Sequence, residues 1–437
     1  MTAPSRTSED RPSVAASPVS AWERIVGMFR QYAQLPRLSG GWYIFLTMLA
    51  RLPLAMLTIG TMSLVTAVTH SYASAGLAAG AVGIGSAVGA PLVGMLADRL
   101  GQRPVLLGYA AANVVSLALL LGACLASQDP SVPWIVAAAF AGGFTSPQVG
   151  PLSRVRWLAL IGRKRGSRAG MNDVAMSFEG TTDELTFVLG PALVGVLAAF
   201  LAPWLPLALA ALLTLVLVPL FALHPSVTAV QGTRNAPAGT TTAEAPDGAE
   251  RLRLAMVVVA VLAMVCMGTF FGGTQAALSA FAGEFANPEL AGLLYSAMGL
   301  SSAVMALSIA AWPEKFRHGA RWVFCALLLT AGSALLLLPL TLGSIIPVLL
   351  LLGVAVGPLM VTVFAIGAQV APTARMSTVM TALSSGIVAG TALGYAVAGA
   401  AAQAGGSRPA FLVSGSAALL LMLLGLVAGR ILKALSR

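Results

Sequence analysis

The sequence is poor in charged residues, cysteine and histidine. Only 9% of its 437 residues are charged, whereas an ordinary soluble domain has about 25%. A globule of this size could not cover its surface with solvated groups at that density, which excludes a soluble enzyme. The cysteines Cys124, Cys266 and Cys325 lie in apolar runs without metal-ligand spacing, so neither a metal site nor a cofactor is expected.

Apolar residues make up 58% of the chain and there are 46 glycines, a composition typical of a polytopic helical membrane protein. A helix that crosses the hydrocarbon core needs about 20 mainly apolar residues. Twelve such runs predict an all-α membrane protein with twelve transmembrane helices. The predicted spans cover residues 42–67, 76–97, 104–126, 133–152, 174–201, 203–223, 253–278, 290–312, 322–341, 344–369, 377–402 and 410–429.

Basic residues predict the orientation of these spans. Of the 25 Lys and Arg residues, 23 fall in the termini and in alternate loops on one side, six of them from Arg154 to Arg168 between spans 4 and 5. The positive-inside rule makes that side cytoplasmic. The net charge of +10 therefore sets topology and does not indicate a nucleic-acid partner. We expect a multi-pass plasma-membrane protein, a monomer among membrane lipids, with both termini cytoplasmic.

An internal repeat divides the chain into two halves. Residues 75–88 align without gaps to residues 291–304, which pairs span 2 with span 8. Residues 224–251 are rich in Thr, Ala, Pro and Gly and predict a cytoplasmic linker. The expected domains are a cytoplasmic tail over 1–40, six-helix bundles over 41–223 and 252–432, and a cytoplasmic tail over 433–437. Residues 22–32 of the first tail predict an amphipathic helix, either lying on the inner leaflet or serving only as a lead-in.

The loop between spans 2 and 3 carries a motif, GMLADRLGQR over residues 94–103. Its Asp98 could be held by a neighbouring helix N-terminus and by Arg103. The loop resembles the signature loop of the major facilitator superfamily, G-x-L-a-D-r-x-G-r-k/r, and departs from it at Gln102. With twelve spans in a six-plus-six repeat, the resemblance covers nearly the whole chain and implies that superfamily's fold and a secondary transporter. It also implies that Asp98 latches the two halves together on the closed cytoplasmic side, within the motif residues Gly94, Asp98, Arg99, Gly101 and Arg103.

Four ionisable residues inside the predicted spans are candidates for function, because a charge at mid-membrane costs on the order of 3 kcal/mol. They are Arg51 in span 1 and Glu179, Asp183 and Glu184 in span 5. At a rise of about 1.5 Å per residue, Arg51 lies at a depth similar to that of Asp183 and Glu184. One arginine cannot neutralise three carboxylates, so at least one is expected to be protonated part of the time.

Two interpretations of these charges are open. In one, Arg51 and an acid form a fixed ion pair that joins spans 1 and 5. In the other, Asp183 or Glu184 carries a proton across the membrane and couples transport to the proton gradient.

Later in span 5, the sequence GPALVG supplies Gly190, Pro191 and Gly195, and a kink is expected at the proline. The segment partly resembles the antiporter motif of the superfamily's drug–proton exporters, but it lacks their glycine pair. Span 4 as predicted also lacks the mid-membrane arginine that many of those exporters carry. The resemblance favours export of a small molecule over uptake.

The resemblance also implies that spans 1, 4, 7 and 10 line the transport path. Their polar and aromatic residues are mostly uncharged, which favours a lipophilic or amphipathic substrate over a sugar or a phosphate ester. These residues are Thr58, Thr61, Ser63, Gln148, Phe270, Phe271, Thr274, Gln275, Thr362 and Phe364. An uptake permease, a non-transporting sensor and a membrane enzyme are the alternatives; the three histidines lie far from paired acids, and no Walker A loop is present.

Overall fold

The computed structural model describes residues 21–126, 131–163, 170–234, 247–285, 290–313 and 316–435, and every regular element in these ranges is helical. Ten helical segments of this described part are long and apolar enough to cross a membrane. Two further predicted spans correspond to the α7–α8 pair and to α14. The predicted all-α polytopic fold is therefore confirmed.

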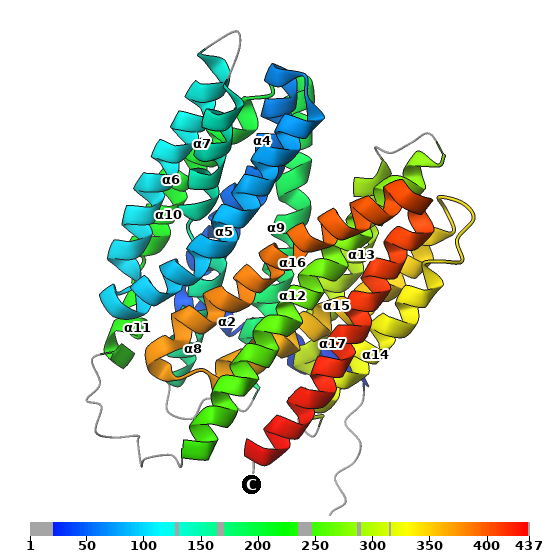
Figure 1. The fold of residues 1–437 in the computed structure, drawn as a ribbon. Helices are drawn as coiled ribbons and strands as arrows, with labels where there is room; N and C mark the ends of the chain where they lie inside the picture. The colour runs from blue at the N-terminus through cyan, green and yellow to red at the C-terminus, as the bar shows by residue number, and fades with distance from the viewer. Residues whose placement is uncertain are drawn as a thin grey trace, which may run out of the picture.

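The helices form two bundles (Figure 1). The first bundle contains α3 (Gly41–Leu49), α4 (Leu52–Thr69), α5 (Tyr72–Leu100), α6 (Gln102–Leu125), α7 (Val132–Phe144), α8 (Val149–Gly162), α9 (Met171–Phe200) and α10 (Leu205–Leu223). The second contains α12 (Asp247–Gly283), α13 (Ala291–Ser308) with the 3₁₀ turn η2 (Ile309–Ala311), α14 (His318–Leu335), α15 (Ile345–Val370), the turn η3 (Thr373–Arg375), α16 (Met376–Gly405) and α17 (Ser407–Leu435).

The two bundles converge at one end and diverge at the other (Figure 1). They contact each other mainly through α5 with α16 and through α9 with α13. The end at which they converge is the one where α5 meets α6 and where α8 and α17 end. Arg103, Arg163 and Arg430 lie there, and we call it the basic end.

Proline interrupts two helices of the first bundle. Pro53 has no N–H and its ring would clash with the carbonyl of Leu49. The helix α3 therefore ends at Leu49, and α4 begins at Leu52. Pro147 acts in the same way on span 4, where α7 ends at Phe144 and α8 begins at Val149. At the second break the Gly142 carbonyl accepts from a neighbouring helix, since the Asn113 side chain of α6 donates to it at 2.8 Å. The apolar pattern predicts both spans as continuous helices, and the two prolines explain the difference.

Span 4 extends further than the sequence predicted, because α8 runs to Gly162. Arg154 and Arg156 consequently lie in α8, with exposed fractions of 1% and 0%, and not in a solvated loop. This corrects the count of loop arginines between spans 4 and 5. Lys164, Arg165 and Arg168 lie outside the described residues.

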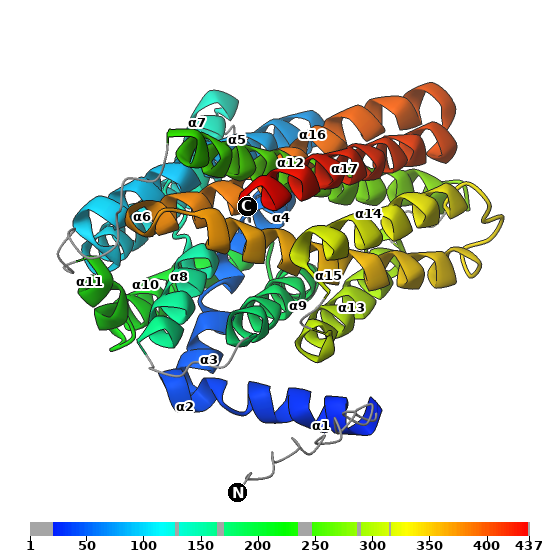
Figure 2. The same cartoon turned by 90° about the horizontal axis from the view of Figure 1, so that it is seen from below.

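The predicted linker over residues 224–251 begins with a helix, α11 (Val227–Arg234), which packs against α8. Arg156 fastens this segment to the bundle, donating to Phe221 O at 2.6 Å and to Ser226 Oγ at 3.1 Å. Before the first bundle, the predicted tail forms α1 (Ala21–Tyr32) and α2 (Leu35–Ser39). Both lie at the basic end (Figure 2).

Candidate functional site

A buried ion network joins spans 1, 4 and 5 of the first bundle. Arg51 stands at the break between α3 and α4 and pairs with Glu179 through one nitrogen. Its other terminal nitrogen donates to Asp183 Oδ1 at 3.0 Å. Arg154 of α8 donates to the second oxygen of Asp183 at 2.6 Å. Two arginines thus oppose two carboxylates, and the network is electrically balanced.

Arg154 is the member of this network that the sequence analysis missed. The apolar run of span 4 ends at residue 152, but the helix continues as α8 to Gly162, so span 4 does carry a buried arginine. The guanidinium of Arg154 also lies 3.9 Å from the ring centroid of Phe364 in α15, so it reaches the second bundle. Its Nε and Nη1 have no hydrogen-bond partner among the described residues.

Glu179 is surrounded by donors in addition to Arg51. Ser153 Oγ donates to its Oε1 at 2.8 Å and Trp157 Nε1 donates to the same oxygen at 2.7 Å. The carboxylate is fully buried. Both oxygens of this buried carboxylate are therefore occupied by donors that the surrounding helices supply. Glu179 thereby positions the Arg51 guanidinium.

Glu184 occupies a different face of α9, toward the second bundle. Ser302 Oγ of α13 donates to its Oε1 at 2.9 Å, and the side chain is 9% exposed. Among the described residues Glu184 forms no ion pair, in contrast to Glu179 and Asp183. It is the one of these three acids whose charge no arginine balances.

The Asp98 carboxylate connects the two bundles at the basic end. Asp98 at the end of α5 accepts hydrogen bonds from Ser377 N at 3.0 Å and from Thr378 N and Oγ1 at 2.8 and 2.7 Å. It therefore caps the N-terminus of α16, where backbone N–H groups have no helical partner. Arg103 is exposed and forms no ion pair with Asp98, so the suggested Asp98–Arg103 pair is not found.

The glycines of the loop motif have separate structural uses. At Gly94, a Cβ would collide with Thr381 Oγ1 and lie 2.7 Å from Ser377 O, so only glycine allows this approach of α5 to α16. Gly101 has a φ of +94° between α5 and α6, a conformation that L side chains rarely adopt. Gln102, the departure from the superfamily pattern, accepts from Arg156 Nε at 2.8 Å. Arg99, the remaining charged residue of the motif, also interacts with a neighbour.

A second contact between the bundles at the basic end centres on Asp173 in the first turn of α9. Arg321 of α14 donates to its Oδ2 at 2.7 Å, and His318 Nε2 lies 3.0 Å from its Oδ1. Further along α9, Ser177 donates to Ala306 O and Thr181 donates to Ala303 O at 3.2 Å. The seam between α9 and α13 is thus hydrogen-bonded over several turns.

The glycine–proline segment of span 5 does not interrupt α9, which runs through Pro191. At Gly190, a Cβ would lie 2.6 Å from Ala55 Cβ, so this glycine allows α9 to approach α4. Gly195 has no neighbour within 4 Å of such an atom. The first glycine is therefore a packing position and the second is not.

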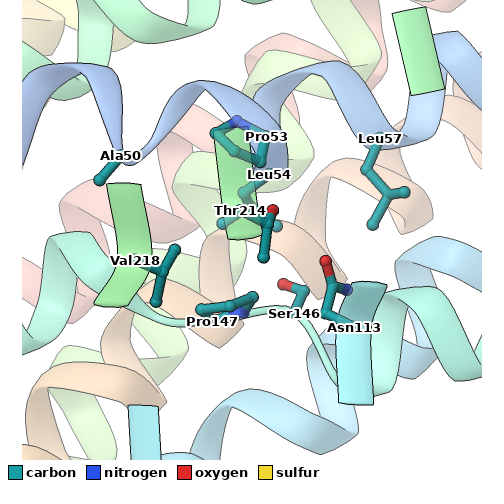
Figure 3. Close-up of a pocket in the computed structure, with 9 residues that line it drawn as sticks. All are labelled: Ala50, Pro53, Leu54, Leu57, Asn113, Ser146, Pro147, Thr214 and Val218. Atoms are coloured by element: carbon teal, nitrogen blue, oxygen red, sulfur yellow. The ribbon is translucent and has the colours of Figure 1, made fainter. Parts of the chain in front are cut away.

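A small pocket lies where the broken spans 1 and 4 meet α6 and α10 (Figure 3). Pro53 and Pro147 line it together with the polar side chains of Asn113, Ser146 and Thr214. Its space is about 230 Å³ even when the open solvent at its mouth is included. It is too small to be the main substrate site.

The residues expected to line the path fall into two groups. Phe270, Thr274 and Thr362 are buried within the second bundle, Thr274 bonding Ser414 and Thr362 its own helix. The Gln148 amide turns back to Ser146 O, and the Thr61 hydroxyl is buried without a partner among the described residues. The other residues retain exposed surface or face the opposite bundle: Thr58, Ser63, Phe271, Gln275 and Phe364.

Comparison with known proteins identifies the family of this fold. The sequence profile of the Major Facilitator Superfamily matches residues 43–385 and, again, residues 260–434. The crystal structure of the human organic anion transporter MFSD10 (TETRAN) is similar, with a TM-score of 0.62 and 21% identity over 93% of this chain and 100% of that one. No curated protein matches by sequence. The chain belongs to the Major Facilitator Superfamily and is a multi-pass membrane transporter, not an enzyme.

Proposed function

We propose that this transporter is a proton-coupled exporter of a small lipophilic or amphipathic molecule, working by alternating access in the plasma membrane. The observation that carries the coupling is the contrast between Glu184 and its neighbours. Protonating Glu179 or Asp183 would leave a buried guanidinium uncompensated, which is costly. Glu184 has only a hydroxyl donor, so it can gain or lose a proton without breaking an ion pair.

The position of Glu184 supports the same role. Its partner Ser302 belongs to the opposite bundle, so the hydrogen bond exists only while α9 and α13 are together. Separation of the two helices would replace Ser302 by water and change the proton affinity of the carboxyl group. A carboxyl group whose surroundings change with conformation is what proton coupling requires.

The positive-inside rule supports a cytoplasmic location for the basic end and for both termini. On this orientation the contacts of Asp98 and Asp173 hold the cytoplasmic side closed. Both halves of the seam come from one chain, which favours a functional monomer. The direction of transport rests on the partial resemblance of residues 190–195 to exporters.

The test is transport into inverted vesicles of cells that express the full chain, with substrates chosen from susceptibility profiling of a deletion strain. Glu184→Gln is expected to abolish collapse of the pH gradient by substrate while retaining substrate counterflow. Glu284→Gln is the matched control, because Glu284 caps α17 by accepting from Ser407 N at 3.0 Å, away from the seam. Proton-driven transport at the wild-type rate in Glu184→Gln would contradict the proposal.

An amphipathic anion is the second candidate substrate. The similar human protein is described as an organic anion transporter, and the unpartnered donors of Arg154 lie beside Phe364 of the opposite bundle. They would suit an anionic group. Competition by matched pairs, an amphipathic acid and its neutral ester, decides between the candidates: preference for the acid supports an anion, and equal competition supports a neutral substrate.

A further inference from the structure

The helix α1 belongs to neither bundle. It lies at the basic end along the side formed by α9 and α13, and it is joined to the first bundle through α2 (Figure 2). It touches α9 and η2, which follows α13 directly. The first bundle anchors α2, which packs against α3 and α8 and buries Leu35. α1 is therefore attached to one half and extends to the other.

The last residue of α1 makes the contact with both halves. Tyr32 Oη donates toward Ser177 Oγ of α9 at 2.8 Å and toward Leu307 O of α13 at 2.9 Å. Ser177 itself donates to Ala306 O, so it accepts from the phenol. A phenol has one hydrogen, which these two acceptors share. Burial raises the pKa of Tyr32 to about 12, so the hydroxyl remains a donor at physiological pH.

We propose that α1 is a clasp, with Tyr32 holding α13 against α9 when the basic end is closed. The inference rests on the proposed alternating access, in which these two helices separate at that end. Because α1 is anchored to the first bundle, separation would preserve the bond to Ser177 and break the bond to Leu307. The clasp therefore favours the closed state and sets how readily the basic end opens.

The experiment measures opening directly and needs no substrate. Spin labels are placed at Arg163 and Arg430, exposed positions at the basic end of the first and second bundles, in a full-length chain without its three native cysteines. Tyr32→Phe removes only the hydroxyl. One hydrogen bond contributes about 0.5–1.5 kcal/mol. The ratio of the open to the closed population, read from the distance distribution, should therefore rise roughly two- to tenfold.

Tyr109→Phe is the matched control, since Tyr109 is a partly buried residue of α6 in the first bundle. Asp98→Asn is the positive control for opening. If Asp98→Asn increases the open population and Tyr32→Phe behaves like Tyr109→Phe, the clasp is refuted and alternating access stands. If neither Asp98→Asn nor Tyr32→Phe changes the distances, the clasp and the alternating-access proposal both fail.

Discussion

Arg154 and Arg51 hold opposite oxygens of one carboxylate, that of Asp183, from two different helices. The shared acid ties span 4 to span 1 through span 5. Gly150 makes room for this arrangement, because a Cβ there would lie 3.3 Å from Arg51 Nε and 3.4 Å from Asp183 Oδ1. The charge balance of the network has a direct consequence for stability.

Asp183→Asn should strongly destabilise the protein, because it leaves one buried positive charge uncompensated. Breaking a buried pair costs about 3–5 kcal/mol, which a thermal unfolding series in detergent would detect. The double variant Arg154→Met/Asp183→Asn keeps the Arg51–Glu179 pair and restores neutrality. It should be more stable than Asp183→Asn alone; a double variant that is less stable would show that charge balance is not what the network provides.

Gly94→Ala should hinder closure of the basic end, because the added methyl group meets Thr381 and the backbone of α16. Overpacking of this kind costs about 1–3 kcal/mol. The readout is maleimide labelling of a cysteine introduced at Ser385, a buried seam residue of α16 that bonds Ala87 O, in a cysteine-free background. Labelling should accelerate in Gly94→Ala.

Gly76→Ala provides the control on the same helix, since an added Cβ there meets nothing within 4 Å. Its labelling rate should equal that of the parent. Acceleration by both substitutions would mean that general loosening of α5, and not contact with α16, explains the effect.

Asp98→Asn should open the basic end, because the N-terminus of α16 loses hydrogen bonds to a charged group. Such bonds contribute about 1.5–3 kcal/mol, so the open population should rise roughly tenfold or more, measured as the Arg163–Arg430 distance. Arg103→Gln should leave that distance unchanged. If the two variants opened the basic end equally, an Asp98–Arg103 interaction, and not the cap on α16, would be what keeps that end closed.

We expect the protein to lose stability in mild acid because His224 becomes protonated. Burial and the nearby Arg156 lower the pKa of His224 below its ordinary value, and its Nδ1 accepts from Ser226 N at 3.2 Å. The His224 imidazole binds a proton more readily in the unfolded chain than in the folded one. Its contribution to the free energy of unfolding is therefore complete above about pH 6.5 and is lost as the pH falls. Thermal unfolding between pH 8 and 5 should show a shallower decline for His224→Gln than for the wild type.

The sequence was sufficient to predict an all-α polytopic fold in two helical bundles, since long apolar runs and an internal repeat indicate both. It was not sufficient to place span 4. Arg154 looked like the first residue of a loop because its neutralising partner, Asp183, comes from a different helix. Pairing of this kind depends on packing, which apolar length does not report.

The partner of Asp98 could not be identified from sequence for a similar reason. Arg103 is five residues away and has the right charge, but the actual donors lie in Ser377 and Thr378, 279 and 280 residues away. Two of them are backbone N–H groups, which every residue except proline possesses. A helix N-terminus was anticipated as one holder of Asp98, although nothing in the sequence indicates which helix.

The proline breaks make the two repeats mechanically unequal. Span 1 is divided into α3 of 9 residues and α4 of 18, and span 4 into α7 of 13 and α8 of 14, whereas α12 and α15 are continuous helices of 37 and 26 residues. Bending in the first bundle can concentrate at Ala50–Arg51 and Thr145–Gln148, beside the ion network. The two halves therefore differ in where they can bend: the first bundle has two complete helix breaks, whereas α15 of the second remains continuous through Pro358.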